Sequence, residues 1–271
     1  MDTSVAPKNL RDHLLARGRQ VVQLHDVAQL TGLPPKAAAD AMTRLRRAGL
    51  FFAPAPGLYV AIPPQYLTWG AVPAVDFVDP TMAKLGRGYY VALLSAAELH
   101  GAAHQRPQLF QVMVDRALKD RDFGRVRLRF YTNSRLAQVP TTSRNTATGH
   151  IRLSTPEATA LDMAARPNDA GGLSNVATVV GELAQDGRLH GPALASAAAF
   201  YPQAVARRLG WLLDRITEHA DTSALSAALA ETVREGAPRR PVDLLDPSGR
   251  RRGPADLRWG VVVNTDVEPD L

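Results

Sequence analysis

The chain has 271 residues, a formal net charge of +6 and a sequence pI of about 10, a length that allows two ordinary domains. It contains no cysteine, which excludes disulfides and thiolate metal ligands. The N-terminus has no apolar core of signal-peptide length, and no run reaches the roughly 18 apolar residues of a membrane span. We therefore expect a cytoplasmic protein without a membrane partner, whose basic balance suits an anionic one.

Residues 7–62 have the pattern of a winged helix-turn-helix. A first helix is expected over residues 7–17. A second, short apolar helix starts at Leu24 and ends at Gly32, because glycine suits the left-handed residue that follows a helix. Pro35 opens a third helix, where proline is tolerated since the N–H groups of a first turn have no partner in the helix.

The third helix should bury one face and expose the other. Apolar residues recur in it at helical spacing, and they are Ala38, Ala41, Met42 and Leu45. A helix of about 10–12 Å diameter fits the major groove of DNA. We expect DNA contact from the residues of its outer face, which are Lys36, Ala37, Asp40, Thr43, Arg44 and Arg47. The same residues would also suit an ordinary solvated face, and winged helices also serve as protein-docking units.

Two β-prone runs follow at 50–52 and 58–60, and the Pro- and Gly-rich residues between them predict a turn, so the pair should form the wing. Residues 1–63 carry eight Lys or Arg against four Asp, so this part holds much of the excess positive charge. We place a DNA-binding domain at 1–63, a packed linker at 64–80 and a mixed α/β domain at 81–271. The expected fold class is α+β.

The C-terminal part alternates strand and helix patterns. Strands are expected at 109–114, 125–131 and 151–153, and a terminal strand at 257–263. Helices are expected near 91–100, from residue 154 or 155 onward, and through most of 173–234. The helix near 154 has two candidate starts: Ser154 with Glu157 has capping-box spacing, and Thr155 with Pro156 would place proline in the first turn.

No arrangement of residues indicates an active site. His100 and His104 have the spacing of two ligands on one helix face, but Gly101 lies between them and no third ligand is apparent. Asp115 ends an expected strand, where a carboxylate could hold Mg²⁺, yet its basic neighbours make ion pairing the simpler interpretation. Glu98, Asp120 and Asp122 could in principle also hold Mg²⁺, and ion pairing with basic neighbours is again the simpler interpretation. We therefore expect no catalytic residue, no metal, no cofactor and no enzymatic activity.

Four motifs follow the winged helix-turn-helix in a fixed order: YYVALLSAAELHG at 89–101, LSTPEATALDM at 153–163, RRLGWLLD at 207–214 and RWGVVVNTDVEPDL at 258–271. The series resembles the AbiE-type (AbiEi) antitoxins of type IV toxin–antitoxin and phage abortive-infection systems, over almost the whole chain. The residues alone give these motifs mostly structural interpretations. The motif at 153–163 suits a helix start, the one at 207–214 core packing and the one at 258–271 a terminal strand. Glu157 and Asp162 stand five residues apart and do not share one helix face.

The resemblance implies a bifunctional antitoxin that is not an enzyme. Its winged domain would bind inverted repeats in the promoter and repress the operon, and its C-terminal domain would counter a cognate nucleotidyltransferase toxin, without a stable complex being required. Two other functions stay open: a one-component transcriptional regulator whose C-terminal domain senses a small molecule, and a nucleic-acid enzyme.

The strand expected at 125–131 places Arg125, Arg127 and Arg129 on one face, alternating with apolar residues on the other. Three guanidiniums about 6.6 Å apart repel one another unless acidic groups lie opposite. They would pair with carboxylates of the same chain, contact flanking DNA, or contact an acidic surface of the toxin.

Overall fold

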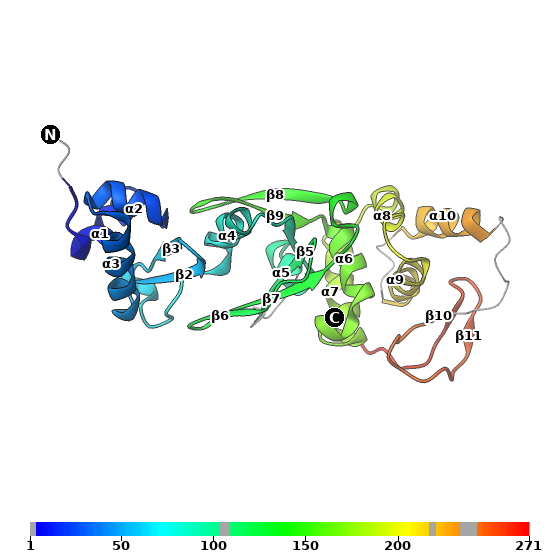
Figure 1. The fold of residues 1–271 in the computed structure, drawn as a ribbon. Helices are drawn as coiled ribbons and strands as arrows, with labels where there is room; N and C mark the ends of the chain where they lie inside the picture. Colours follow the sequence, from blue (N-terminus) through cyan, green and yellow to red (C-terminus); the bar gives the residue numbers. More distant parts are fainter. Residues whose placement is uncertain (1–3, 103–108, 217–220, 234–242, 271) are drawn as a thin grey trace. The chain divides into compact units, whose positions relative to one another are not determined.

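The computed structural model describes residues 4–102, 109–216, 221–233 and 243–270. Helices and three β-sheets make up this part of the chain (Figure 1), so the expected α+β class is confirmed. The chain forms two compact units. The first comprises residues 1–90, 108–136 and 143–152, and the second comprises residues 91–107, 137–142 and 153–271.

The first unit begins with three helices and a small sheet, coloured blue to cyan in Figure 1. The elements are a 3₁₀ turn Pro7–Asn9, α1 Leu10–Leu15, β1 Val21–Gln23, α2 Leu24–Thr31, α3 Pro35–Arg47, β2 Phe51–Ala55 and β3 Leu58–Ala61. The strands pair antiparallel in the order β1-β3-β2. Gly32 ends α2 in the left-handed region, at φ 66°. The helices expected from the sequence are present, whereas β1 was not predicted and β2 continues into the expected turn.

Both faces of the β2–β3 hairpin are buried, each in a different core. Phe51 and Ala61 are partners across the hairpin and pack with α1, α2 and α3. Phe52 and Val60 are the next partners and face a second core with Phe77. The Phe52 and Phe77 rings lie edge to face at 5.0 Å between centroids. Because side chains alternate along a strand, one hairpin joins the helical part to the rest of this unit.

The segment after the hairpin packs into the second core. It contains 3₁₀ turns at Pro64–Tyr66 and Ala74–Asp76, and then α4, Val78–Leu85. Phe77 is fully buried. α4 was not predicted, and it runs across the boundary expected between residues 80 and 81. The division into 1–63, 64–80 and 81–271 does not follow the compact units and stays a prediction about functional domains.

A six-stranded sheet follows, in the order β6-β7-β5-β4-β9-β8. Its strands are β4 Tyr89–Val91, β5 Phe110–Val114, β6 Arg121–Phe123, β7 Val126–Thr132, β8 Thr141–Thr146 and β9 Gly149–Ser154, with a 3₁₀ turn at Leu136–Gln138. β5 runs parallel to β7, and β4 runs parallel to β9. β6 and β7 form an antiparallel hairpin in which Asp122 lies opposite Arg127.

The second unit is mainly helical, and α6 lies at its centre. Its helices are α5 Leu93–Leu99, α6 Pro156–Ala165, α7 Leu173–Gln185, α8 Gly191–Ala198, α9 Gln203–Ile216 and α10 Ser223–Val233, with a 3₁₀ turn at Pro167–Ala170. Every residue of α6 from Glu157 to Ala164 is buried, because α5, α7, α8 and α9 all pack against it. Small residues such as Ala158 and Ala160 allow this close approach on all sides.

The start of α6 decides between the two expected caps. Thr155 has an extended backbone, and its side chain accepts a hydrogen bond from the Ala158 N–H, with Pro156 in the first turn. The Ser154 hydroxyl instead lies 2.6 Å from that of Thr159. The Thr155 interpretation is confirmed and the Ser154 capping box is wrong.

Replacing Thr155 with alanine should lower the free energy of unfolding by about 1 kcal/mol, because the Ala158 N–H loses its acceptor. Urea unfolding followed by circular dichroism measures the change. Thr155→Ser keeps the acceptor oxygen and should recover most of the loss. Equal losses in the two variants would show that the Thr155 methyl group, rather than the cap, stabilises this end of α6.

The C-terminal residues form a small sheet against α9. Its strands are β10 Asp243–Leu244, β11 Ala255–Asp256 and β12 Val261–Val262, in the order β10-β12-β11. The strand expected over 257–263 is wrong at its start, where Leu257 is 80% exposed in a turn. Trp259 is buried over Gly210, where a Cβ atom would overlap the indole ring. The motifs at 207–214 and 258–271 are therefore two sides of one packed contact.

Candidate nucleic-acid interface

Helix α3 exposes the face that the sequence predicts. The four buried residues are the expected ones, Ala38, Ala41, Met42 and Leu45. Of the residues expected to contact DNA, Lys36, Asp40, Thr43, Arg44 and Arg47 are exposed and Ala37 is half-buried. Their spacing of 4, 3 and 4 residues places Lys36, Asp40, Thr43 and Arg47 in one row opposite the core, with Arg44 beside it.

The charges on this face are not neutralised by neighbours. Within the described residues, no ion pair or side-chain hydrogen bond involves Lys36, Asp40, Arg44 or Arg47. The Thr43 hydroxyl donates to the Ala39 carbonyl at 3.0 Å, so its proton is used within the helix. The cationic donors of α3 are therefore available to an external anion such as a phosphate group.

Arg46, which is not among the residues predicted to contact DNA, is also exposed and without an ion pair in the described part of the chain. It lies at the flank of the face, about 80° from the row on a helical wheel. The run of three arginines at 44, 46 and 47 was the signal that could have found it. Together these arginines make the C-terminal turn of α3 its most cationic part.

The hairpin that would serve as a wing offers little to an anion. Residues 51–61 contain no Lys or Arg, and both hairpin faces are buried as described above. The carbonyl of Pro54 is already held by the guanidinium of Arg121. Burial lowers the pKa of Arg121. Only Pro56 in the turn is exposed, and Ala53 and Gly57 are half-buried, so α3 carries the chemistry of this surface.

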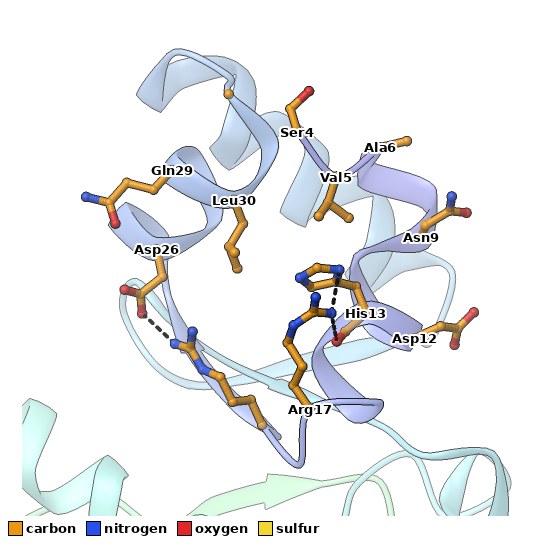
Figure 2. Close-up of a pocket in the computed structure, with 12 residues that line it drawn as sticks. Ser4, Val5, Ala6, Asn9, Asp12, His13, Arg17, Asp26, Gln29 and Leu30 are labelled. Atoms are coloured by element: carbon orange, nitrogen blue, oxygen red, sulfur yellow. Dashed lines mark hydrogen bonds and ion pairs between the residues drawn. The ribbon is translucent and has the colours of Figure 1, made fainter. Parts of the chain in front are cut away.

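Figure 2 shows a groove between the N-terminal segment, α1 and α2. The groove measures about 1110 Å³ and is open to solvent. The side chains of His13 and Arg17 point into it, with Arg17 Nη1 3.0 Å from His13 Nδ1 (Figure 2). On its other side Arg19 forms an ion pair with Asp26 at 3.5 Å. Asp26 neutralises Arg19 at one side of the groove, whereas Arg17 hydrogen-bonds to His13 and forms no ion pair within the described residues.

Internal ion pairing, one of the three expected outcomes, holds for only one of the three arginines in the strand expected at 125–131. Arg129 contacts Asp122 at 2.7 Å and Asp120 at 3.6 Å, as internal ion pairing predicts. The hydrogen bond from Asp122 raises the pKa of Arg129. Arg125, in the turn before β7, and Arg127 are exposed and form no ion pair within the described residues. Two cations, not three, remain for an external partner.

The sites weighed for metals and catalysis are occupied by internal contacts. Asp115 lies 3.4 Å from Arg116 and 3.9 Å from Arg87. His100 Nε2 lies 2.8 Å from the Ser154 carbonyl oxygen, and His104 falls outside the described residues. Across the described ranges, no group of three or more His, Asp or Glu residues could hold a metal ion.

Glu157 and Asp162 are both buried in α6, and they have different partners. Glu157 Oε1 accepts from the backbone N–H of His190 at 3.3 Å and lies 3.4 Å from that residue's Nδ1. Asp162 accepts a hydrogen bond from the Tyr201 hydroxyl at 2.9 Å. They do not form a carboxylate pair, as the sequence spacing predicts. The 153–163 motif therefore builds the centre of the second unit.

No helix in the described ranges has the length and apolar character that crossing a bilayer requires.

Comparison with known proteins finds a matching family and a solved structure of similar fold. The family model described as the AbiEi antitoxin C-terminal domain matches residues 90–215. The crystal structure of the RV2827C protein from Mycobacterium tuberculosis has a TM-score of 0.66 at 18% identity, covering 94% of this chain and 90% of that one. No curated protein matches.

A nucleotidyltransferase-like protein from Paracoccidioides brasiliensis has a TM-score of 0.30 at 12% identity, over 60% of this chain and 87% of that one. That score is too low to indicate a shared fold. The match to RV2827C extends the fold likeness over nearly the whole chain, and the family match covers three of the four sequence motifs in whole or in large part. Residues 90–215 match the AbiEi antitoxin C-terminal domain, and the resemblance to the AbiE-type antitoxins is confirmed over that part of the chain.

Proposed function

We propose that this chain is a type IV antitoxin that neutralises a cognate nucleotidyltransferase-like toxin and represses its own operon. Residues 1–63 act as a winged helix-turn-helix that binds inverted repeats in the promoter. The antitoxin part is supported by the AbiEi domain at residues 90–215. The protein acts in the cytoplasm, and no stable complex with the toxin is required.

The DNA-binding part rests on one observation, the exposed row of α3. Lys36, Arg44 and Arg47 carry positive charges that no carboxylate of the described chain neutralises. Phosphate contacts by such residues position a protein on a duplex, and contacts to base edges from the same helix supply sequence preference. The helix-turn-helix order of α2 and α3, with Gly32 between them, is the arrangement in which a second helix enters the major groove.

Two measurements test the two activities separately. Fluorescence anisotropy with the intergenic duplex upstream of the gene should show binding that weakens steeply with salt, and an unrelated duplex should bind more weakly. Co-expression with the gene directly downstream should restore growth that this gene alone prevents. Absence of duplex binding at modest ionic strength would overturn the DNA-binding part, and failure to restore growth would overturn the antitoxin part.

The free arginines beside the β6–β7 turn give a further prediction. If Arg127 contacts flanking DNA, Arg127→Glu should weaken promoter binding and lower the salt slope by about one unit for the lost phosphate contact. If Arg127 contacts an acidic surface of the toxin, the same variant should lose toxin rescue and keep promoter binding.

Arg129→Glu is not a suitable control because it would break the ion pairs with Asp120 and Asp122. Arg188→Glu is preferable, since this arginine lies in the second unit, is exposed and pairs with Asp186 at 3.4 Å. An Arg127→Glu protein with unchanged promoter affinity and unchanged rescue would refute both roles.

A further inference from the structure

Asp40 stands out on the exposed row of α3 because it is the only acidic residue of that helix. It lies in the middle of the row, one turn after Lys36 and one turn before Arg44. Side chains four residues apart on a helix are near enough to form an ion pair. Nevertheless Asp40 is exposed and pairs with neither cation, nor with any other group of the described residues.

A carboxylate at the centre of a DNA-facing surface is unfavourable for binding to phosphates, since like charges repel. It becomes favourable only opposite a hydrogen-bond donor. In the major groove the donors on the base edges are the exocyclic amines of cytosine and adenine. The adenine amine lies beside N7, an acceptor that repels a carboxylate, whereas the cytosine amine has no acceptor beside it on the same base.

We propose that Asp40 is a specificity-determining residue, which accepts a hydrogen bond from the 4-amino group of one cytosine in the operator. This inference rests on the proposed DNA-binding function and assigns a role within it. The cations of α3 provide affinity for any duplex. Asp40 opposes that affinity everywhere except at a site that presents the cytosine amine at the right position.

The test uses the full chain and compares the wild type with Asp40→Asn and Asp40→Ala. Anisotropy is measured with the upstream duplex and with an unrelated duplex. It is also measured with each single base-pair replacement in the part of the upstream duplex that the protein protects from nuclease digestion. For the wild type, changing one C·G pair to T·A should weaken binding about tenfold or more, because thymine presents an acceptor there. Both variants should lose this discrimination at that one position, and Asp40→Ala should bind the unrelated duplex several-fold more tightly.

Two controls isolate the role of Asp40. Lys36→Ala should weaken binding to every duplex by a similar factor and keep the base preference. Asp12→Asn removes the same charge from α1, where the carboxylate is exposed and paired with Arg11 at 2.9 Å, and should change neither affinity nor preference.

The inference fails if Asp40→Asn keeps the wild-type preference at every position. It also fails if Asp40→Ala tightens binding to all duplexes, operator variants included, by one common factor, since Asp40 would then only repel. A wild-type protein that binds no duplex at all overturns the proposed function itself, and this result is distinct from the other two.

Discussion

Replacing both Arg44 and Arg47 with alanine should abolish operator binding while toxin rescue persists. The two arginines lie one turn apart on the exposed face of α3, and no carboxylate of the described residues pairs with either. Each contact with a phosphate or a guanine edge is worth roughly 1–3 kcal/mol. Losing two should therefore lower affinity about a hundredfold or more at near-physiological salt, and should lower the salt slope by about two units if both contact phosphates.

A matched control removes the same charge elsewhere. Arg166 and Arg188 in the second unit form exposed ion pairs with Asp169 at 3.6 Å and Asp186 at 3.4 Å. Their double alanine variant lowers the net charge equally and should leave operator binding within about twofold, because exposed pairs contribute little. If the Arg44 and Arg47 variant also lost toxin rescue while remaining folded, separate roles for the two parts of the chain would be refuted.

Replacing Arg208 with alanine should produce the largest loss of stability. Arg208 is 4% exposed and donates three hydrogen bonds to backbone carbonyl oxygens. The acceptors are Leu245 at 2.6 Å, Ala164 at 2.6 Å and Leu244 at 3.0 Å. Burial lowers the pKa of Arg208, and the charge of Asp243 opposes this. A guanidinium nevertheless stays protonated in proteins, so it holds β10 and the end of α6 against α9.

The alanine variant leaves buried carbonyl groups without donors, and each costs about 1–3 kcal/mol. A total loss of about 3–5 kcal/mol in the free energy of unfolding is expected, measured by urea unfolding. Arg208→Lys keeps the charge but cannot reach three separate acceptors, so it should recover only part of the loss.

The neighbouring Arg207 provides the comparison. It donates to Asp243 at 2.9 Å from a more exposed position, and Arg207→Ala should cost about 1 kcal/mol. Equal losses for Arg207→Ala and Arg208→Ala would show that the buried carbonyl contacts are not what stabilises the C-terminal segment.

Local spacing was sufficient to predict the helices of the N-terminal part and the exposed face of α3. The buried residues of α3 and the left-handed end of α2 at Gly32 depend on neighbours within one or two turns, so they can be derived from the residue order. The motif at 153–163 was correctly interpreted as a helix start, but its cap had two solutions. Only the structure showed that Thr155 provides it, because the Ser154 hydroxyl faces Thr159.

Partners distant in the chain could not be predicted in the same way. Arg129 forms ion pairs with Asp120 and Asp122, which lie across the β6–β7 turn. The other two arginines of the strand have no ion-pair partner among the described residues. The short strand β1 forms because β3 lies beside it. The α4 helix was missed because its first turn, residues 78–80, lies in the Pro-rich segment that was interpreted as a linker.

From the sequence alone came the α+β class, the helices of the N-terminal part, the cationic face of α3 and the resemblance to the AbiE-type antitoxins. The tertiary structure decided that both faces of the hairpin are buried, that α6 is enclosed on every side, and that Arg208 holds residues 36 and 37 positions further along the chain. The physical reason is that helix periodicity is a property of adjacent residues, whereas burial and ion pairing depend on which distant segments pack together.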